Sequence, residues 1–366
     1  MKVAIVHDWF LEGGAEKVVL ELHHMYPEAP IYTSYCSPAW REKLDNTVIT
    51  GYLQHWPFSK LRKFIPLLRQ HWFENLDFSD YDLVISSSGA EAKGIKVPKS
   101  VMHINYCHAP THYYWNRYYE YIKSPGFGVF NPLARLGLKV LLNPIRKWDL
   151  KAAQRPDYMI ANSTFTCNQI KKYYHRDSTV IHPPVEIGKF LLSANGSQLS
   201  ARNGFIITGR HVPYKRFDLA IEACNQLQLP LKVLGTGPET KKLKRLAGPT
   251  IDFKGYVSDQ EIVTLLQSAE AFIFPGLDDF GIAPVAAMAA GTPVIAYKDG
   301  GSLDYIVEGK TGLFFNKQTS SSLETALQNF KKHIFNSEHI KNEAKEYDPV
   351  IFRQKMHDYI AKARRS

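Results

Sequence analysis

Two basic residues stand close together in the second half of the chain, where a predicted strand gives way to a predicted helix. Arg210 lies at the carboxyl end of the strand 204–210, and Lys215 follows five residues later, just before a helix expected to begin near Phe217. Two cations at the N-terminus of a helix can hold a diphosphate and neutralise the charge that grows on a leaving group. A solvated basic turn is the alternative interpretation, which the nearby glycine-rich stretch "GTGPE" (235–239) makes weaker.

A later loop combines carboxylates with the start of another helix. The stretch "FIFPGLDDFGIAPVAAMAAG" (272–291) begins with an apolar run, continues with Asp278 and Asp279, and ends in small residues that predict a helix. N–H groups at the head of a helix have no partner inside that helix, so they attract oxygen atoms of a ligand. The groups concerned here belong to Phe280, Gly281 and Ile282.

Glycines and aromatic residues follow two predicted strands in the first half. Gly13 and Gly14 precede a predicted helix, where the backbone can approach a ligand and free N–H groups attract phosphate; a tight turn is an equally simple interpretation. His108 ends the predicted strand 101–108, and a dense aromatic stretch (106–121) surrounds it where a pocket is expected. His108 could donate a hydrogen bond to a sugar hydroxyl or a phosphate, or it could cap a loop.

Composition limits the class of protein and its partners. The 366 residues are 45% hydrophobic and 22% charged, which is typical of a globular chain with room for two domains. A net charge of +10 favours an anionic partner: nucleic acid, a membrane surface or a phosphorylated small molecule. The four cysteines are widely spaced, so neither a disulfide framework nor a zinc site is indicated, and a reducing cytoplasm fits best. With no signal-like start and no run of 18 apolar residues, we expect a soluble or surface-attached protein.

The candidate residues are positioned by strands that alternate with helices. Strands that alternate with helices and each end in Gly, Ser, Asn or His predict an α/β fold of parallel sheets with helices on both faces, with ligands beyond the carboxyl ends of the strands. The segment 183–203 is rich in Pro, Gly and Ser and is predicted as a linker between domains 1–182 and 204–347. The predicted strands are 2–7, 81–88, 101–108, 158–163, 204–210, 231–237, 251–257, 271–276 and 293–300.

Taken together and in order, these motifs resemble a known family. "GRHVPYKRFDLAIEA", "GYVSDQE", "FPGLDDFGIAPVAAMAAGTPVIA" and "GGSLDYIVEGKTGLFF" are similar to the nucleotide-sugar domain of family-4 retaining glycosyltransferases. "HDWFLEGGAEKVV", "YDLVISSSGAEAKG", "YCHAPTHYYW" and "ANSTFTCNQIKKYY" resemble the bacterial mannosyltransferase branch of that family. The similarity runs from residue 1 to about residue 320, which makes it more specific than any single motif.

The resemblance implies a fold and a set of roles. The fold is GT-B, two facing Rossmann-like domains with a cleft between them, in which the final helix, here 348–366, returns to the first domain. Gly13 and Gly14 would approach phosphate or acceptor, and His108 would touch the transferred sugar. Arg210 and Lys215 would hold the diphosphate. The loop 276–282 would cradle the donor sugar, with Asp278 and Asp279 beside the backbone of Phe280, Gly281 and Ile282, and Tyr256 and Val257 would lie near the base.

The family's signature of two glutamates is altered in this chain. The first Glu corresponds to Asp278, one methylene shorter, and the second to Ala286, which cannot accept the usual hydrogen bond from the donor ribose. Gly89 also stands where relatives often carry His. These departures leave open a weakened or inactive scaffold or glycan-binding subunit, and whether Ala286 is natural or engineered.

The resemblance also implies a reaction and its requirements. We expect a hexose, in the first place mannose from GDP-mannose and alternatively a sugar from a UDP-sugar, to pass with retention onto a lipid-linked or polysaccharide acceptor. No carboxylate is placed as a nucleophile, so attack from the leaving-group side is favoured. No metal or other cofactor is expected, since Arg and Lys take the place of a cation. The acceptor, the linkage and the oligomeric state do not follow from the sequence.

Two basic stretches predict contact with a membrane. Residues 58–73 and 130–148 combine Lys and Arg with apolar residues at helical spacing, which suits a helix lying on an anionic bilayer; an ordinary packed helix with a solvated face is the alternative. We therefore expect a peripheral protein on the cytoplasmic face of the cell membrane. Nucleic-acid binding is not expected, because these basic residues flank apolar helices and no stacking aromatics on a sheet accompany them.

Overall fold

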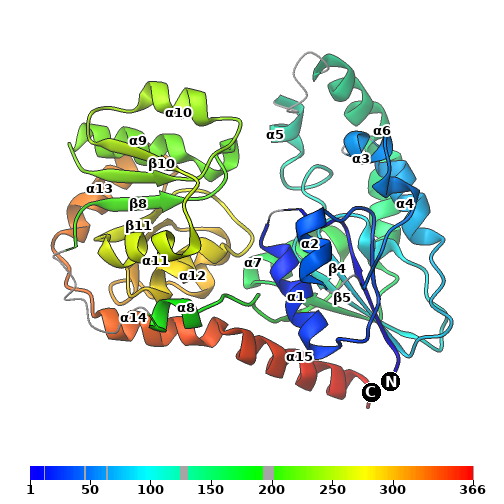
Figure 1. The fold of residues 1–366 in the computed structure, drawn as a ribbon. Helices are drawn as coiled ribbons and strands as arrows, with labels where there is room; N and C mark the ends of the chain where they lie inside the picture. Colours follow the sequence, from blue (N-terminus) through cyan, green and yellow to red (C-terminus); the bar gives the residue numbers. More distant parts are fainter. Residues whose placement is uncertain (12, 45–46, 63–64, 124–130, 193–201, 366) are drawn as a thin grey trace. The chain divides into compact units, whose positions relative to one another are not determined.

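The computed structural model describes residues 1–11, 13–44, 47–62, 65–123, 131–192 and 202–365. The chain forms two compact units (Figure 1), one made of residues 1–183 and 352–366 and the other of residues 184–351.

The first unit is built on a seven-stranded parallel sheet with the strand order β3-β2-β1-β4-β5-β6-β7. Its central strands β1 and β4 are buried along their whole length, and β5 is buried after its first residue, as expected for a parallel sheet with helices on both faces. The chain order reverses between the neighbours β1 and β4. The strands are β1 Val3–His7, β2 Ile31–Thr33, β3 Val48–Ile49, β4 Leu83–Ser88, β5 Met102–Cys107, β6 Tyr158–Ala161 and β7 Thr179–Val180.

Helices connect these strands, and the last helix of the chain also packs on this unit. In α15, Phe352, Met356 and Ile360 are spaced at one helical face and are buried in the same cluster as Ile5 and Val18. The helices are α1 Ala15–Met25, α2 Pro38–Lys43, α3 Phe58–Leu61, α4 Pro66–Glu74, α5 Tyr118–Lys123, α6 Asn131–Ala153, α7 Thr164–Tyr174 and α15 Pro349–Ala363, and the 3₁₀ turns are η1 Tyr52–Gln54 and η2 Ala92–Gly94.

The second unit contains a six-stranded parallel sheet with the order β10-β9-β8-β11-β12-β13. The order reverses between β8 and β11, whose residues Ala271 and Phe205 are paired. The strands are β8 Phe205–Thr208, β9 Leu231–Leu234, β10 Ile251–Gly255, β11 Ala271–Phe274, β12 Val294–Tyr297 and β13 Gly312–Phe315.

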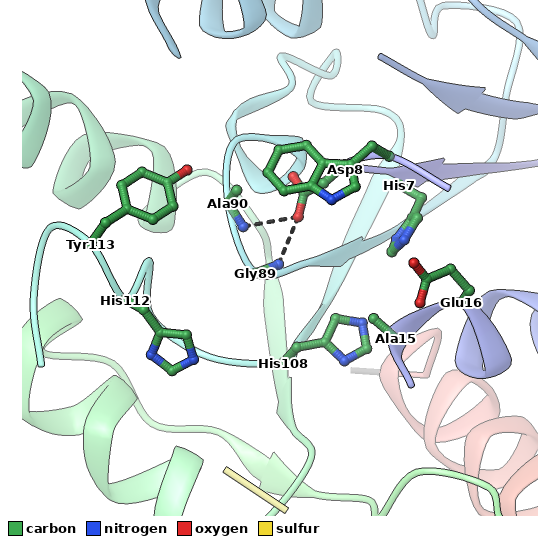
Figure 2. A pocket seen from close by; sticks show the side chains of 10 residues that line it. His7, Asp8, Ala15, Glu16, Gly89, Ala90, His108, His112 and Tyr113 are labelled. Carbon is green, nitrogen blue, oxygen red and sulfur yellow. Dashed lines mark hydrogen bonds between the residues drawn. The ribbon is translucent and has the colours of Figure 1, made fainter. Parts of the chain in front are cut away.

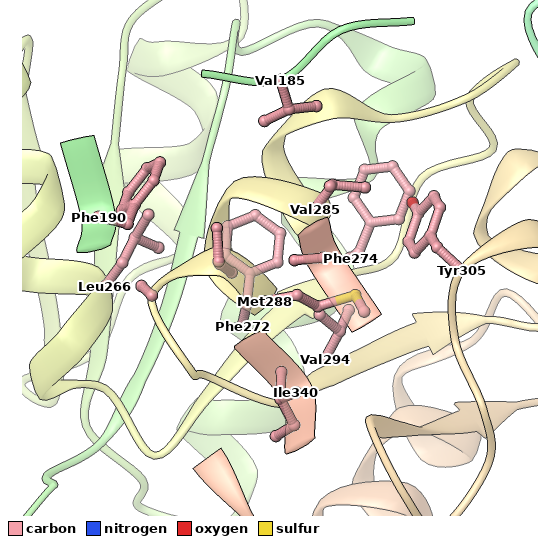
Figure 3. Close-up of a cluster of buried hydrophobic side chains, with 14 of the residues drawn as sticks. Val185, Phe190, Leu266, Phe272, Phe274, Val285, Met288, Val294, Tyr305 and Ile340 are labelled. Atoms are coloured by element: carbon pink, nitrogen blue, oxygen red, sulfur yellow. The ribbon is translucent and has the colours of Figure 1, made fainter. Parts of the chain in front are cut away.

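Apolar clusters cover both faces of this sheet. On one face, Phe272 and Phe274 pack with Val285 and Met288 of the alanine-rich helix α12 and with Tyr305 (Figure 3). The alanines of α12 are small enough to let this helix lie close to the sheet. The helices are α8 Gly188–Leu192, α9 Phe217–Gln226, α10 Thr240–Leu246, α11 Asp259–Ser268, α12 Ile282–Ala289, α13 Ser320–Phe330 and α14 Ser337–Ala344, with 3₁₀ turns η4 Pro213–Lys215, η5 Gly300–Asp304 and η6 Lys345–Tyr347.

The predicted fold class, two parallel-sheet α/β units, is confirmed. In the stretch 183–203, predicted as a linker, the described residues from Pro184 onward belong to the second unit, where Val185 and Phe190 are core residues. Residues 193–201 of that prediction lie outside the described residues.

The two basic stretches differ from the predicted pair of amphipathic helices in one respect. Segment 58–73 is divided between α3 and α4, and its Arg69 is only 2% exposed because it forms a two-pronged ion pair with Glu91, at 3.0 and 2.9 Å. Arg69 therefore cannot contribute to a basic surface. Segment 130–148 lies within α6, which continues through Pro144; residues 63–64 and 130 lie outside the described residues.

None of the described helices is both long and apolar enough to cross a bilayer.

Candidate functional site

Candidate residues of the second unit gather where its chain order reverses. The loops after β8 and β11 leave the same edge of the sheet at adjacent strands, so the turn with Arg210 and Lys215 lies next to the loop 276–282. Crevices at such reversals are the usual ligand sites of open α/β sheets. Gly276 permits the close approach, because a Cβ there would lie 2.9 Å from the Cα of Lys215.

The ammonium group of Lys215 contacts the carboxylate of Asp278. Lys215 ends the turn η4, and its Nζ donates to Oδ2 of Asp278, with the side chains only 20% and 12% exposed. The other carboxylate oxygen, Oδ1, is buried and has no hydrogen-bond partner among the described residues. The pair therefore presents one paired and one unpaired oxygen at the strand edge, and a ligand hydroxyl would satisfy the second.

Gly300 and Gly301 pack closely against the loop that carries Asp278. The N–H of Gly301 donates to the carbonyl of Asp278 at 3.0 Å, and Gly300 has a φ of +75° with space for no side chain, since a Cβ would lie 2.6 Å from that carbonyl oxygen. A Cβ on Gly301 would lie 2.3 Å from the Cα of Phe280. These contacts fix the backbone of the loop.

The head of α12 has no side-chain cap. Gly281 precedes the helix with a φ of 88°, and no side chain caps the first turn, so its N–H groups keep their capacity to bind oxygen. Phe280 is buried against Tyr305, while Asp279 and Ile282 are half-buried. Ala286, one turn further, is also half-buried and contacts the apolar cluster.

The remaining predicted residues of this unit are less enclosed. Arg210 is exposed, and no ion pair of its side chain is found within the described part of the chain. Tyr256 is 86% exposed, directly after β10, and Val257 packs partly on the cluster around Phe272. The structure thus brings Lys215, Asp278 and the head of α12 together, whereas Arg210 and Tyr256 reach into solvent.

A pocket of about 240 Å³ lies at the carboxyl edge of the first sheet (Figure 2). It opens where the chain order reverses between β1 and β4, so its walls come from the segments after β1, β4 and β5 and from the start of α1. The lining residues are His7, Asp8, Trp9, Ala15, Glu16, Gly89, Ala90, His108, His112 and Tyr113.

The predicted residue His108 is part of this pocket, and a serine positions it. Its Nε2 lies 2.7 Å from the Oγ of Ser87, and its ring lies 6.3 Å from that of His7, edge to face. Nδ1 of His7 lies 2.8 Å from the carbonyl oxygen of Ser87, to which it donates. Burial lowers the pKa of His7, partly offset by the nearby Glu16, which favours the neutral imidazole.

The two acidic residues in the pocket have different partners. Asp8 accepts three backbone hydrogen bonds, from Gly89, Ala90 and Ala92 at 2.8, 2.9 and 2.7 Å, and so fixes the turn after β4. Figure 2 shows the bonds from Gly89 and Ala90. In Glu16, Oε1 accepts from the N–H of Leu11, and the carboxyl also interacts with the residue's own backbone N–H, while Oε2 is buried with no geometric hydrogen bond among the described residues. Burial raises the pKa of both carboxyls.

Of the predicted glycines, Gly89 lines this pocket, whereas Gly13 and Gly14 directly precede its lining residues Ala15 and Glu16. Gly14 caps α1 without a side-chain hydrogen bond, and a Cβ on Gly13 would lie 2.8 Å from Oε2 of Glu16. A Cβ on Gly89 would lie 3.9 Å from the Cβ of His108, so its lack of a side chain leaves the pocket open there. Among the described residues, no group of three or more His, Cys, Asp or Glu side chains could hold a metal.

Two family models account for most of the chain. The model for glycosyl transferases group 1 matches residues 196–347, and that for glycosyltransferase family 4 matches residues 12–189. The chain belongs to the family-4 glycosyltransferases. The predicted family and the prediction of an enzyme that transfers a sugar are therefore confirmed.

Named relatives include mannosyltransferases. The chain is 23% identical to the alpha-1,3/1,6-mannosyltransferase alg2 of Schizosaccharomyces pombe over 94% of its own length and 78% of that protein. It is 30% identical to a GDP-mannose-dependent alpha-mannosyltransferase of Corynebacterium glutamicum over 38% of this chain and 33% of that one. A D-inositol 3-phosphate glycosyltransferase of Streptomyces avermitilis is 23% identical over 50% of this chain and 46% of the relative.

Solved structures show the same GT-B fold. HepE of Anabaena, crystallised with UDP, aligns with a TM-score of 0.70 and 16% identity over 99% of this chain and all of that one. A sucrose-phosphate synthase of Thermosynechococcus elongatus aligns with a TM-score of 0.69 and 14% identity over 99% of both chains. The similarity extends over both units of this glycosyltransferase.

Sequence reasoning missed several residues that the sites contain. Glu16, His7 and Asp8 line the first pocket, and Tyr305 lies behind the loop in the second unit. His7 ends the first predicted strand and Asp8 directly follows it, which was a signal for a position at the sheet edge. For Tyr305 the sequence holds no such signal.

Proposed function

We propose that this glycosyltransferase moves mannose from GDP-mannose onto a lipid-linked or polysaccharide acceptor, with retention of the anomeric configuration, in the assembly of bacterial cell-surface glycans. The choice of mannose is supported by relatives that are named as mannosyltransferases, one of them dependent on GDP-mannose. The observation that carries the proposal is the pairing of Lys215 with Asp278 beside the uncapped head of α12.

The chemical roles follow from charge and position. Lys215, together with Arg210, would neutralise the diphosphate as it leaves, where the growing negative charge makes electrostatic stabilisation largest. The unpaired Oδ1 of Asp278 would accept a hydrogen bond from a donor-sugar hydroxyl, and the N–H groups at the head of α12 would bind donor oxygens. Val257 and Tyr256 would lie near the base. With two side-chain cations available for the diphosphate, the reaction would need no metal.

Retention would arise from attack on the face that the diphosphate leaves. The acceptor hydroxyl would form its bond to the anomeric carbon as the bond from that carbon to the diphosphate oxygen breaks, and the hydroxyl proton would pass to the leaving phosphate oxygen. Positioning of the two substrates then supplies most of the rate. His108, in the pocket of the first unit, would contact the transferred sugar, with Gly13 and Gly14 near the acceptor.

A peripheral position on the inner face of the cell membrane would bring a lipid-linked acceptor to the enzyme. The support is an exposed apolar stripe on α6, in which Leu133, Leu136 and Val140 are 69%, 59% and 65% exposed, next to the exposed Lys139 and Lys147. Apolar side chains at helical spacing beside cations suit an anionic bilayer surface.

A UDP-sugar is the second candidate donor. HepE, which shares the fold, has been crystallised with UDP and with UDP-glucose. Because Ala286 provides no carboxylate for the ribose, the alternative of a weakened enzyme or a glycan-binding subunit also has a structural argument.

One panel separates these functions. GDP-mannose, UDP-glucose and UDP-GlcNAc are each incubated with the full chain in EDTA, and nucleoside diphosphate release is measured alongside the thermal shift. Release from GDP-mannose above that from either UDP-sugar supports the proposal. Faster release from a UDP-sugar would mean that this UDP-sugar, and not GDP-mannose, is the donor. Stabilisation by a nucleotide without any release favours the binding subunit.

A further inference from the structure

Glu16 is a buried carboxylate in an open pocket, and neither the family signature nor the donor site uses it. Its side chain leaves the first turn of α1 and is 5% exposed, yet it lines the pocket that His7 and His108 also line. In Figure 2 its carboxylate points toward the His7 ring. Oε1 is engaged by the N–H of Leu11 at 3.2 Å, whereas Oε2 has no hydrogen-bond partner among the described residues.

An unpaired buried carboxylate oxygen is costly unless a ligand supplies the donor. Leaving such an atom without a hydrogen bond destabilises a folded protein, which is why most buried polar groups are paired. Two of the side chains that line the pocket with Glu16 are engaged elsewhere: the carboxylate of Asp8 accepts three backbone N–H groups, and Nδ1 of His7 donates to the carbonyl of Ser87. The missing donor is therefore expected from a molecule in the pocket.

The geometry points to a further substrate-binding residue: we propose that Oε2 of Glu16 accepts a hydrogen bond from a hydroxyl of the sugar acceptor, in a polyol subsite shared with His7 and His108. This inference rests on the proposed function, since it assigns the acceptor to this pocket. Glu16 acts here by binding and positioning, and it takes no proton in the reaction.

The surroundings of Glu16 favour a neutral polyol over a cation. The pocket contains one carboxylate oxygen in need of a donor, together with imidazole rings and the ring of Trp9. A sugar donates a hydroxyl to the carboxylate, exchanges hydrogen bonds with imidazoles and lays its apolar face on an aromatic ring, so it matches all three surfaces. A hydroxyl that donates to the carboxylate also stabilises its charged form, against the effect of burial.

The test uses methyl α-D-mannopyranoside as a probe for the subsite, with GDP release from GDP-mannose as the readout. If the bound probe accepts mannose, GDP release rises; if it only excludes water, hydrolysis slows and GDP release falls. In either case the probe concentration that gives half of the change measures how tightly the probe occupies the subsite. We expect Glu16→Gln, which keeps the shape but loses the charge, to raise this concentration about tenfold, because hydrogen bonds to charged acceptors are the stronger ones. GDP release without probe is measured on the same preparations, so that the half-effect concentration of each variant is compared with that variant's own rate.

Two further variants make the result specific. Gly13→Ala places a methyl group at the position 2.8 Å from Oε2, so it should reproduce the effect of Glu16→Gln without changing the carboxylate itself. Glu21→Gln is the matched control: it makes the same change on the same helix to a buried carboxylate that pairs with Arg353. It should leave the half-effect concentration unchanged even if it lowers the melting temperature.

The outcomes separate this inference from the proposed function. If the wild-type chain releases a nucleoside diphosphate from none of the donors, the proposed function fails and the subsite fails with it. If the wild type is active but the probe has no effect up to its solubility limit, or acts equally on Glu16→Gln, only the subsite is overturned. A parallel change in Glu21→Gln would also overturn it, because the effect would then reflect stability alone.

Discussion

At the scale of single residues, the resemblance to the family predicts that Asp278 and Ala286 occupy the two acidic positions of its signature. Asp278 is held in contact with Lys215, and its second oxygen is unpaired, so the position retains a carboxylate able to bind a hydroxyl. Ala286, by contrast, offers only a methyl group on the half-buried side of α12. We therefore expect sugar recognition to be better preserved than nucleotide recognition.

Restoring the missing carboxylate tests that expectation. Ala286→Glu should tighten binding of GDP or UDP roughly ten- to a hundredfold, because a hydrogen bond to a charged group contributes about 1.5–3 kcal/mol. Calorimetry on the two forms gives the affinity, and Ala286→Leu serves as a control of size without charge. Equal affinities for the Glu variant and the present chain would mean that position 286 does not face the ribose. If the alanine is an engineered substitution, the Glu variant should also transfer sugar much faster.

The contacts between these residues could not be predicted from the sequence, although most of the residues could. Lys215 and Asp278 were each assigned a ligand, but they are 63 positions apart, and only the pairing of β8 with β11 brings them together. Glu16 was not identified at all, because a Glu in the first turn of a helix is ordinarily explained by the helix dipole. Its lack of a partner for Oε2 is a property of the folded pocket.

At the scale of elements, strands that contain an apolar run were predictable, whereas two-residue strands and a strand that begins with glycine were not. Val3–His7 and Leu83–Ser88 are buried along their whole length and end in polar residues, so their sequences predict strands. The strands β3 and β7 have two residues each, and β13 begins at Gly312, so none of them carries a strand pattern. Pro144 did not end α6, even though a proline inside a helix removes a hydrogen bond.

The last helix is expected to contribute strongly to the stability of the first unit. Phe352→Ala should lower the free energy of unfolding of that unit by about 3–5 kcal/mol, because it leaves a cavity in a cluster where Phe352 is 2% exposed and packs on Tyr106. Val350→Ala is the matched control on the same helix, since Val350 is 60% exposed. Denaturant unfolding measures both, and similar losses in the two variants would contradict the burial of this face.

The stripe on α6 makes a prediction about the membrane. The chain should bind vesicles that contain anionic lipid more tightly than neutral ones, and added salt should weaken the binding because it screens surface charge. Changing Lys139 and Lys147 together to Glu should abolish the preference in a sedimentation assay. The control changes the exposed Lys331 and Lys332 to Glu, which alters the net charge equally on the other unit. Equal loss in both double variants would show a general charge effect and no docking by α6.

At the scale of the whole molecule, the two units carry related sites built by the same rule. Each has a parallel sheet whose chain order reverses once, between β1 and β4 in the first unit and between β8 and β11 in the second. Each places its candidate residues on the loops that leave that reversal, the usual location of ligands in such sheets. We propose that the second unit binds the donor and the first unit binds the acceptor. The central claim of this proposal is that Lys215 stabilises the leaving diphosphate.

Release of GDP from GDP-mannose in the presence of EDTA, compared between the wild-type chain and Lys215→Ala, tests that claim most directly. Because Lys215 would meet the diphosphate when its charge is greatest, the variant should have a kcat lower by on the order of 100-fold. Lys242→Ala, which changes an exposed lysine of α10 paired with Glu239, should turn over as the wild type does. Wild-type turnover that EDTA abolishes, or equal kcat values in wild type and Lys215→Ala, would contradict the account.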